Sequence, residues 1–423
     1  MARRPRAVVV LTGSELVRGD RADANGAFLG RELTRLGLEP ARVVIVGDDP
    51  AELEAVFRDA VEADVCVLSG GLGPTHDDRT IETLARALGR PLAFVPELET
   101  EIEAVSRGIA ERLGRPYADF APGVRKQATV PAGGEPLGLA GTAPAVVVEH
   151  DGRVAVALPG PPGELRRLWT RFLASPALAA VLAGILPPEH LLLRFFGPSE
   201  SSVAQALAEA GGEVPGLEVT VCAHDLEIRV DLFAAERARD RALELGRALA
   251  ERFGDELFAR DERPVAEIVL ELCRGRGWTL ATAESCTGGL VGARLTDVPG
   301  ASDVFLGAVV AYADEVKRQA LGVPEELLLR HGAVSAEAAE AMAAGARTTL
   351  AADAAVAVTG IAGPGGGTPE KPVGLVYVGL QTPETSATWR VQLPGDREAV
   401  RTRATALALH RLRGLLAQGG TNA

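Results

Sequence analysis

The segment TAESCTGG, residues 282–289, places a carboxylate, a hydroxyl, a thiol and a second hydroxyl in consecutive positions before two glycines. Ser285 or Cys286 could act as a nucleophile, and the glycines could bring backbone amides close to an anion. The pattern is not the G-x-S-x-G turn of serine hydrolases, and two glycines are too few for a phosphate-binding P-loop. A nucleophilic serine at this position therefore needs a base from elsewhere in the chain.

The candidate bases in this part of the chain are few. Two histidines, His331 and His410, are interpreted as structural residues. There are only two lysines, and one of them, Lys317, directly follows the apolar segment 305–313. A lysine can act as a base where burial or a neighbouring charge destabilises its ammonium group. The alternatives are an exposed helical lysine and a thiol nucleophile at Cys286.

Two further segments of the same region could bind negative charge. The glycine-rich loop 360–367 follows an apolar strand, so its backbone amides could face an oxyanion or a phosphate, although a flexible hairpin loop is the alternative. Arg397 and Arg401 are four residues apart and lie on one face of a predicted helix start. Such a pair suits a carboxylate or phosphate, and the alternative is an ion pair with Asp396 or Glu398.

A second set of polar residues lies near the start of the chain. The segment 69–78, SGGLGPTHDD, follows an apolar strand, and its Asp77 and Asp78 could hold a divalent cation. The alternative is a turn before a helix whose acidic first residues favour the helix dipole. Glu15 and Glu164 lie in loops after other strands. Three such loops at one edge of a sheet predict a pocket.

Apolar strands that alternate with amphipathic helices must position these residues. The order of elements between residues 7 and 88 predicts a parallel sheet, in which ligands bind beyond the carboxyl ends of the strands. Residues 191–257 predict a small α+β unit with a strand, a helix, a hairpin and a helix. The remainder is again α/β, with Ser335 capping a helix. We therefore expect an α/β protein of three domains, at residues 1–175, 190–258 and 262–418.

Composition excludes several classes of protein. A net charge of −13 over 423 residues argues against a nucleic-acid binder, which needs a basic surface. No stretch reaches the roughly 20 apolar residues of a membrane span, and the run at 7–11 is too short for a signal peptide. Four widely spaced cysteines predict reduced thiols in a cytoplasmic protein.

Six short motifs occur in order in the N-terminal part: TGSEL, the D-x-N of residues 23–25, SGGLGPTHDD, RKQA, GTAP and LPGPPGEL. Together they resemble the molybdopterin-binding-like domain of the CinA family. The resemblance implies a MogA/MoaB-type fold and hydrolysis of ADP-ribose to AMP and ribose 5-phosphate with a divalent metal, Mg, Mn or Co. It also implies metal or water handling by Glu15, Asp77 and Asp78, and phosphate contacts from Gly70, Gly71, Gly73 and Thr75.

Another six motifs occur in order in the C-terminal part: TAESCTGG, YADEVK, HGAVS, GIAGPGGG, EKPVG and PGDREAVR. They resemble the C-terminal CinA domain, which implies deamidation of nicotinamide mononucleotide without a cofactor. Carried over by position, Ser285 is the nucleophile, Lys317 its base and Tyr312 a substrate contact. The oxyanion and the phosphate would be held by Thr287, by the amides of Gly360 to Gly363, and by Arg397 or Arg401. Asp314 stands where the family usually has Asn and adds a negative charge near Tyr312.

Residues and resemblance together predict a bifunctional hydrolase of pyridine-nucleotide metabolism. Ser285 would attack the carboxamide carbonyl after proton transfer to Lys317, ammonia would leave, and water would release nicotinic acid mononucleotide. We expect a homodimer that binds nicotinamide mononucleotide and ADP-ribose, and neither nucleic acid nor membrane. The alternative is a non-catalytic molybdopterin- or nucleotide-binding protein linked to competence or DNA damage.

Overall fold

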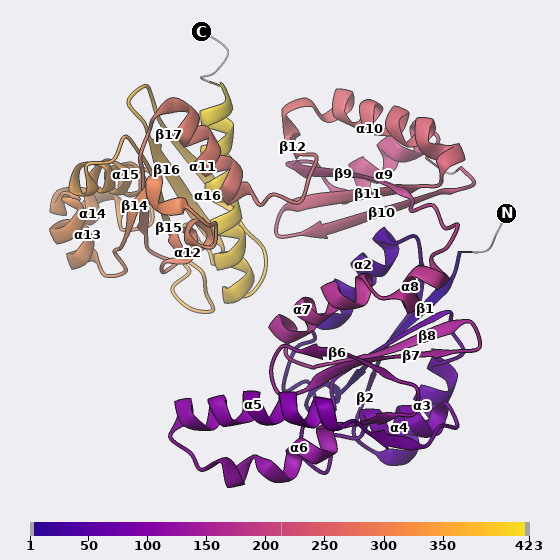
Figure 1. Ribbon diagram of the computed structural model, residues 1–423. Helices are drawn as coiled ribbons and strands as arrows, with labels where there is room; N and C mark the ends of the chain where they lie inside the picture. Colours follow the sequence, from indigo (N-terminus) through magenta and orange to yellow (C-terminus); the bar gives the residue numbers. More distant parts are fainter. Residues whose placement is uncertain (1–3, 213, 419–423) are drawn as a thin grey trace. The chain divides into compact units, whose positions relative to one another are not determined.

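The computed structural model describes residues 4–212 and 214–418 (Figure 1). The chain divides into two compact units, Met1–Glu189 and His190–Ala423. Within the described ranges, no helix has the length and apolar character needed to cross a bilayer. The division into three domains expected from the sequence stays a prediction.

The first unit is built on a six-stranded sheet with the order β2-β1-β3-β8-β7-β6. The first four of these strands run parallel, and β7 and β6 extend the sheet antiparallel at one edge. The bounds are β1 Arg6–Thr12, β2 Glu39–Val46, β3 Val65–Ser69, β6 Glu135–Leu139, β7 Pro144–His150 and β8 Arg153–Leu158. The parallel sheet predicted from the buried apolar runs is confirmed.

Helices cover both faces of this sheet, and each face has its own apolar core. One face carries α2 Asn25–Arg35, α7 Pro162–Leu173 and α8 Pro176–Val181. The other carries α3 Pro50–Ala60, α4 Thr80–Ala87, α5 Pro96–Leu113 and α6 Ala121–Gln127. The short elements are α1 Ser14–Val17, β4 Leu92–Phe94, β5 Thr129–Pro131 and the 3-10 turn Tyr117–Asp119. The loops at the carboxyl ends of the parallel strands stay open to a ligand.

The second unit begins with a small sheet of order β10-β11-β9-β12. Its elements are β9 Glu189–Phe196, α9 Glu200–Glu209, β10 Leu217–His224, β11 Glu227–Ala234, α10 Arg239–Phe253 and β12 Leu257–Ala259. Two 3-10 turns, Glu236–Ala238 and Gly254–Glu256, flank α10. The predicted order of strand, helix, hairpin and helix is confirmed, and the structure adds the short strand β12, which was not predicted.

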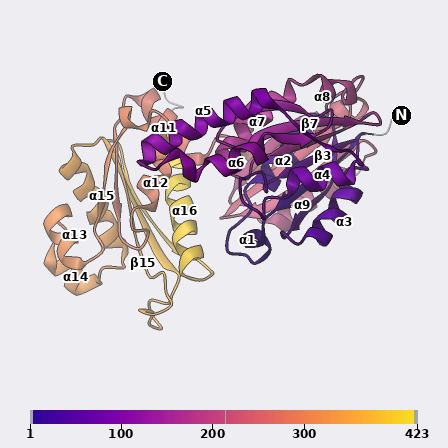
Figure 2. The same cartoon turned by 60° about the horizontal axis from the view of Figure 1, so that its bottom comes forward.

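The C-terminal sheet of the second unit has the order β14-β13-β15-β16-β17. Its strands are β13 Leu280–Glu284, β14 Phe305–Val310, β15 Ala354–Gly360, β16 Leu375–Gln381 and β17 Ser386–Gln392. Figure 2 shows helices on both sides of β15. One face packs against α11 Val265–Arg276, α12 Leu290–Thr296 and α16 Arg397–Gln418, and the other against α13 Asp314–Leu321, α14 Glu325–His331 and α15 Ala336–Leu350.

The parallel pairing of β13 with β14 and β15 brings three carboxyl ends to one edge of this sheet. The loops that follow these strands contain Ser285, Tyr312 and the glycine-rich segment 360–367, which were predicted to form the site. Ser335 accepts a hydrogen bond of 3.1 Å from the amide of Ala338, so the predicted cap of α15 is confirmed. The fold therefore gathers the candidate residues of the C-terminal part at a single sheet edge.

Candidate active site

Ser285 is the first residue after the central parallel strand β13. Its amide donates to the carbonyl of Val358 at 2.9 Å, and on the other side the amide of Ala311 donates to the carbonyl of Glu284 at 2.8 Å. These two bonds place Ser285 between the chain ends of β15 and β14. Its side chain is 8% exposed, and its hydroxyl forms no hydrogen bond with any described residue. The hydroxyl is thus buried, central and uncommitted.

Glu284, fully buried, accepts hydrogen bonds from the start of α12. Its carboxylate receives the amides of Gly289 at 2.9 Å, Val291 at 3.1 Å and Gly292 at 2.8 Å. The hydroxyl of Thr282 adds a bond of 3.3 Å. A buried carboxylate is stable only when its oxygens are satisfied in this way. Glu284 therefore fixes the loop that follows it and is not free to act on a substrate.

Cys286 belongs to the apolar core between the sheet and α16. It is 5% exposed, and burial raises the pKa of its thiol to about 12. A nucleophilic cysteine has the opposite environment, with partial exposure and a lowered pKa. The thiol of Cys286 is protonated at neutral pH, and this favours Ser285 over its neighbour as the nucleophile.

Lys317 lies on α13 and is 1% exposed. Its ammonium donates to the carbonyl oxygen of Tyr312 at 3.0 Å and to the carboxylate of Asp314 at 3.4 Å. The side chain of Asp314 is 61% exposed, so its charge is well hydrated and attracts the ammonium only weakly. Tyr312 directly follows Ala311, whose amide bonds the carbonyl of Glu284. The Lys317 side chain is therefore bound to the segment that runs beside Ser285. No described hydrogen bond joins Lys317 to Ser285 directly.

Tyr312, Arg397 and Gly363 come together from three separate elements. Arg397, at the start of α16, donates to the hydroxyl of Tyr312 at 3.2 Å and to the carbonyl of Gly363 at 2.8 Å. Tyr312 is 62% exposed, so the cluster faces solvent. Three of the predicted substrate-binding residues thus meet at the edge where Ser285 lies.

Arg401, one turn further along α16, is committed to the protein backbone. Its guanidinium donates to the carbonyl of Cys286 at 3.1 Å and to that of Thr287 at 3.0 Å. The hydroxyl of Thr287 is fully buried and has no hydrogen-bond partner among the described residues. A buried hydroxyl without a hydrogen-bond partner costs free energy. The position of this hydroxyl, two residues from Ser285, is consistent with a role in binding a ligand.

The glycine-rich loop after β15 is only partly available for a ligand. The amide of Ile361 donates to the carbonyl of Leu375 at 2.9 Å, which extends the strand pairing. Gly363 has φ of 84°, and a Cβ there would lie 2.6 Å from a methyl of Val373. Only glycine fits this position without strain. Of the amides predicted from Gly360 to Gly363, that of Ile361 is already used by the sheet.

The two histidines interpreted as structural lie outside this cluster. His331 pairs with Glu337 at 3.2 Å. The ring of His410 is fully buried, bonds Glu227 at 2.8 Å and stacks on Phe196 at 4.0 Å. That interpretation is confirmed for His410, which joins α16 to β11.

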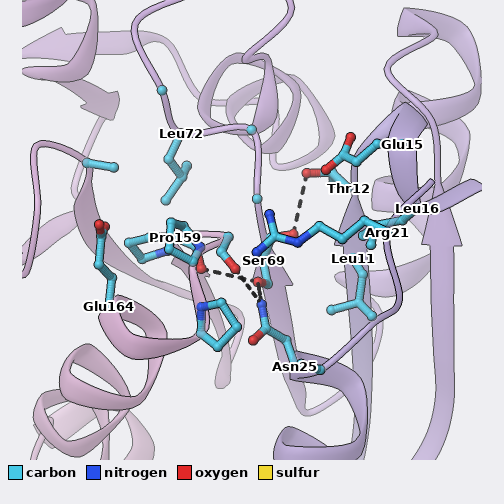
Figure 3. Close-up of a pocket in the computed structure, with 18 of the residues that line it drawn as sticks. Leu11, Thr12, Glu15, Leu16, Arg21, Asn25, Ser69, Leu72, Pro159 and Glu164 are labelled. Carbon is cyan, nitrogen blue, oxygen red and sulfur yellow. Dashed lines mark hydrogen bonds between the residues drawn. The ribbon is translucent and has the colours of Figure 1, made fainter. Parts of the chain in front are cut away.

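The first unit contains a separate cavity of about 350 Å³ at the carboxyl ends of its parallel strands (Figure 3). Gly70, Gly71 and Gly73 line it together with Glu15. At Gly70, φ is 105° and a Cβ would lie 2.5 Å from the carbonyl oxygen of Thr12, so a side chain cannot be accommodated. The pocket predicted from three loops is confirmed.

Several residues of this cavity were not assigned from the sequence. Asn25 donates to the hydroxyl of Ser69 at 3.1 Å and to the carbonyl of Gly160 at 2.8 Å, which ties three loops together. Figure 3 shows Arg21 extending into the cavity and Glu164 approaching from the side opposite Glu15. Burial raises the pKa of the Glu164 carboxyl. The D-x-N motif signalled Asn25, whereas nothing in the sequence distinguished Arg21.

Two of the three acidic residues predicted to bind a metal lie at the cavity and the third does not. Glu15 and Asp78 line the cavity, whereas Asp77 and Thr75 are exposed outside it. The carboxylate of Asp78 accepts bonds from the amide of Thr75, at 2.9 Å, and from its hydroxyl. Within residues 4–212 and 214–418, no three His, Cys, Asp or Glu side chains are grouped to hold a metal ion. The predicted set therefore does not fit a metal as it stands.

Comparison with known proteins gives two family matches. Residues 262–416 match "CinA C-terminal domain", and residues 8–180 match "Probable molybdopterin binding domain". A "CinA-like protein" of Mycolicibacterium paratuberculosis is 44% identical, covering 97% of this chain and 98% of that protein. One of Mycobacterium tuberculosis is 43% identical, covering 98% of each.

Among solved structures, a competence-damaged protein (CinA) superfamily member of Klebsiella pneumoniae is 36% identical. The match covers 37% of this chain and 99% of that chain, with a TM-score of 0.35.

Proposed function

This chain belongs to the CinA family and carries a molybdopterin-binding-like domain, and from that premise we propose that its C-terminal part is an amidase. The proposed substrate is nicotinamide mononucleotide, and the products are nicotinic acid mononucleotide and ammonia. The geometry at the edge of β13, β14 and β15 supports the proposal, because a hydroxyl, an ammonium and cationic side chains gather there.

The observation that carries the proposal is the burial of Lys317 beside the Ser285 loop. Its side chain is 1% exposed, and its described partners are one carbonyl and one exposed carboxylate. Burying a charge with such weak compensation is expensive, so a structural role alone explains it poorly. A base for a serine nucleophile needs this kind of environment.

The reaction that this arrangement supports has two stages. In the first, the neutral amine of Lys317 takes the hydroxyl proton as Ser285 attacks the carboxamide carbon. Lys317 then returns this proton to the carboxamide nitrogen, which departs as ammonia and leaves an ester on Ser285. In the second, water attacks the ester formed on Ser285 and releases the carboxylic acid. Arg397 and Tyr312 face solvent at the same edge and are the proposed contacts for the nucleotide phosphate.

The proposal is tested on the full chain by following ammonia released from nicotinamide mononucleotide. K317M should reduce kcat by about 1,000-fold, because the methionine keeps the volume and removes the base. K371M is the matched control, since Lys371 donates to the carbonyl of His331 at 2.6 Å and lies outside the cluster. Equal rates in K317M and the wild type would refute the role of Lys317.

A binding protein without catalysis is the alternative from another class. Mass spectrometry of the intact chain after brief mixing with nicotinamide mononucleotide separates the two proposals. An amidase accumulates or turns over an ester on Ser285, whereas a binding protein retains the substrate with its carboxamide intact.

The second candidate function is cleavage of ADP-ribose to AMP and ribose 5-phosphate in the cavity of the first unit. The cavity favours it, because glycine loops, Arg21 and the carboxylates of Glu15 and Glu164 all line the same space. A divalent metal is part of the expectation from the family, but the described carboxylates do not form a ligand group, so no step is derived through one. Measuring AMP formation from ADP-ribose with and without added Mg²⁺ or Mn²⁺ tests both the cleavage activity and its dependence on a metal.

A further inference from the structure

We propose that Glu284 and Arg401 are positioning residues that hold the Ser285 loop from its two ends and thereby present the serine hydroxyl for attack. The inference rests on the proposed amidase function and extends it to two residues that touch no substrate. It also reassigns Arg401, which the sequence grouped with Arg397 as a possible phosphate contact.

The loop after Ser285 makes a sharp turn through two glycines. Gly288 and Gly289 both have positive φ, 61° and 100°, within five residues of β13. A turn of this kind exposes several amides in one direction. The buried carboxylate of Glu284 satisfies those of Gly289, Val291 and Gly292 within 3.1 Å. Glu284 thus determines how the chain leaves the strand after Ser285.

Arg401 fixes the opposite set of polar groups in the same loop. The carbonyls of Cys286 and Thr287 both accept from the guanidinium of Arg401, at 3.1 and 3.0 Å. A guanidinium supplies two donors in a rigid fork, which an ammonium cannot reproduce. Glu284 therefore binds amides at the end of the loop and the start of α12, whereas Arg401 binds two carbonyls just after Ser285.

The two arginines of α16 have different partners and therefore different proposed roles. Arg397 donates to Gly363 and to the solvent-exposed Tyr312, whereas Arg401 donates to the two carbonyls of the serine loop. The four-residue spacing that places both on one helix face lets one helix position all three loops. In this account Arg397 remains available to the nucleotide and Arg401 does not.

The first experiment measures kcat and KM for nicotinamide mononucleotide in R401Q and E284Q. A serine displaced by a fraction of an ångström loses reactivity without losing substrate, so kcat should fall about 100-fold while KM stays within about threefold. R411Q is the matched control, because Arg411 lies on the same helix and stacks on Trp389, remote from the loop. It should keep both constants.

Chemical rescue separates positioning from general stability. Guanidinium ion, at concentrations far below those that unfold the chain, should restore part of the kcat of R401A, and methylammonium should restore less. A variant that loses activity only because it is destabilised would show no such preference. Unchanged kcat in R401Q and E284Q, or equal rescue by the two cations, would overturn the proposal.

A readout independent of catalysis distinguishes this inference from the proposed function. Hydrogen exchange of peptides covering residues 285–292 should accelerate in E284Q and R401Q while the other peptides keep their wild-type rates. If the wild type releases no ammonia, the amidase proposal fails, and this exchange pattern still tests the loop. Wild-type protection of residues 285–292 in both variants would refute the positioning role.

Discussion

Arg397 donates a hydrogen bond of 3.2 Å to the hydroxyl of Tyr312, although 85 positions separate the two residues in the chain. The same guanidinium reaches the carbonyl of Gly363, so the loops after β14 and β15 meet at the start of α16. These contacts place Arg397 and Tyr312 on the solvent-facing side of the candidate active site, where we propose that the substrate phosphate binds.

Removing the guanidinium should weaken substrate binding more than catalysis. R397Q should raise KM for nicotinamide mononucleotide by about 10- to 100-fold and leave kcat within about threefold, because a phosphate contact is made equally in the ground state and the transition state. Y312F, which loses one acceptor, should raise KM by about fivefold. R390Q, an exposed arginine on β17, serves as the control. A large fall in kcat alone would instead place Arg397 in the chemical step.

The stability of the second unit should decrease in mild acid through His410. Burial lowers the pKa of this imidazole below its ordinary value of 6.5, and the bond to Glu227 only partly offsets that effect. As the pH falls below about 6.5, His410 therefore binds a proton in the unfolded chain before it does so in the folded chain. The free energy of unfolding decreases as a result. Thermal unfolding between pH 7.5 and 5 measures this slope.

Variants of two histidines isolate the contribution of His410. H410N should be less stable at pH 7.5 by about 2 kcal/mol, since it loses ring packing and the Glu227 contact, but its melting temperature should vary less with pH. H331N should follow the wild-type slope, because the His331 side chain is 35% exposed and its ion pair with the exposed Glu337 contributes little to stability. Identical slopes in H410N and the wild type would show that other groups control acid sensitivity.

In the first unit, the two adjacent aspartates should behave differently. D78A should abolish AMP formation from ADP-ribose, because Asp78 lines the cavity and binds Thr75, which holds the loop. D77A should keep the rate within about twofold, since that side chain lies outside the cavity. Rates are compared by chromatography of AMP at several metal concentrations. An equal fall in the rate of AMP formation in both variants would instead support the prediction that Asp77 and Asp78 bind a metal together.

Glu164 provides a test of acid–base chemistry in the same cavity. E164Q preserves shape and removes the ionisable group, and it should lower the rate of AMP formation by about 100-fold if Glu164 transfers a proton. If the Glu164 carboxylate is the base, activity should fall as the pH decreases and this carboxyl becomes protonated. Its raised pKa means that the fall should begin at a higher pH than for an ordinary glutamate. A pH profile of E164Q parallel to that of the wild type would exclude this role.

Much of the fold could be predicted because apolar strands and capped helices are local signals. The runs that became β1, β3, β13 and β15 are continuous and buried, and Ser335 caps α15 as its position indicated. The short strand β12 was missed, because three residues carry too little periodicity. Loop motifs after parallel strands also predicted which segments would share a sheet edge.

The partners of individual side chains could not be predicted in the same way. Arg397 and Arg401 look equivalent in sequence, and only tertiary packing shows that one meets Tyr312 while the other bonds the carbonyls of the serine loop. Asp77 and Asp78 likewise differ only in which way the turn directs them. Such distinctions depend on how each loop is oriented. Periodic sequence patterns predict helices and strands, but they carry no signal for loop orientation.

The central claim, that Ser285 is an amidase nucleophile, is tested most directly by comparing S285A with C286A in the full chain. Ammonia released from nicotinamide mononucleotide is measured for both variants and the wild type. We expect S285A to lose at least about 1,000-fold in activity and C286A to stay within about tenfold of the wild type, because the Cys286 thiol is protonated and buried in the core. Retained activity in S285A together with loss in C286A would show that the nucleophile is the thiol of Cys286 and not Ser285.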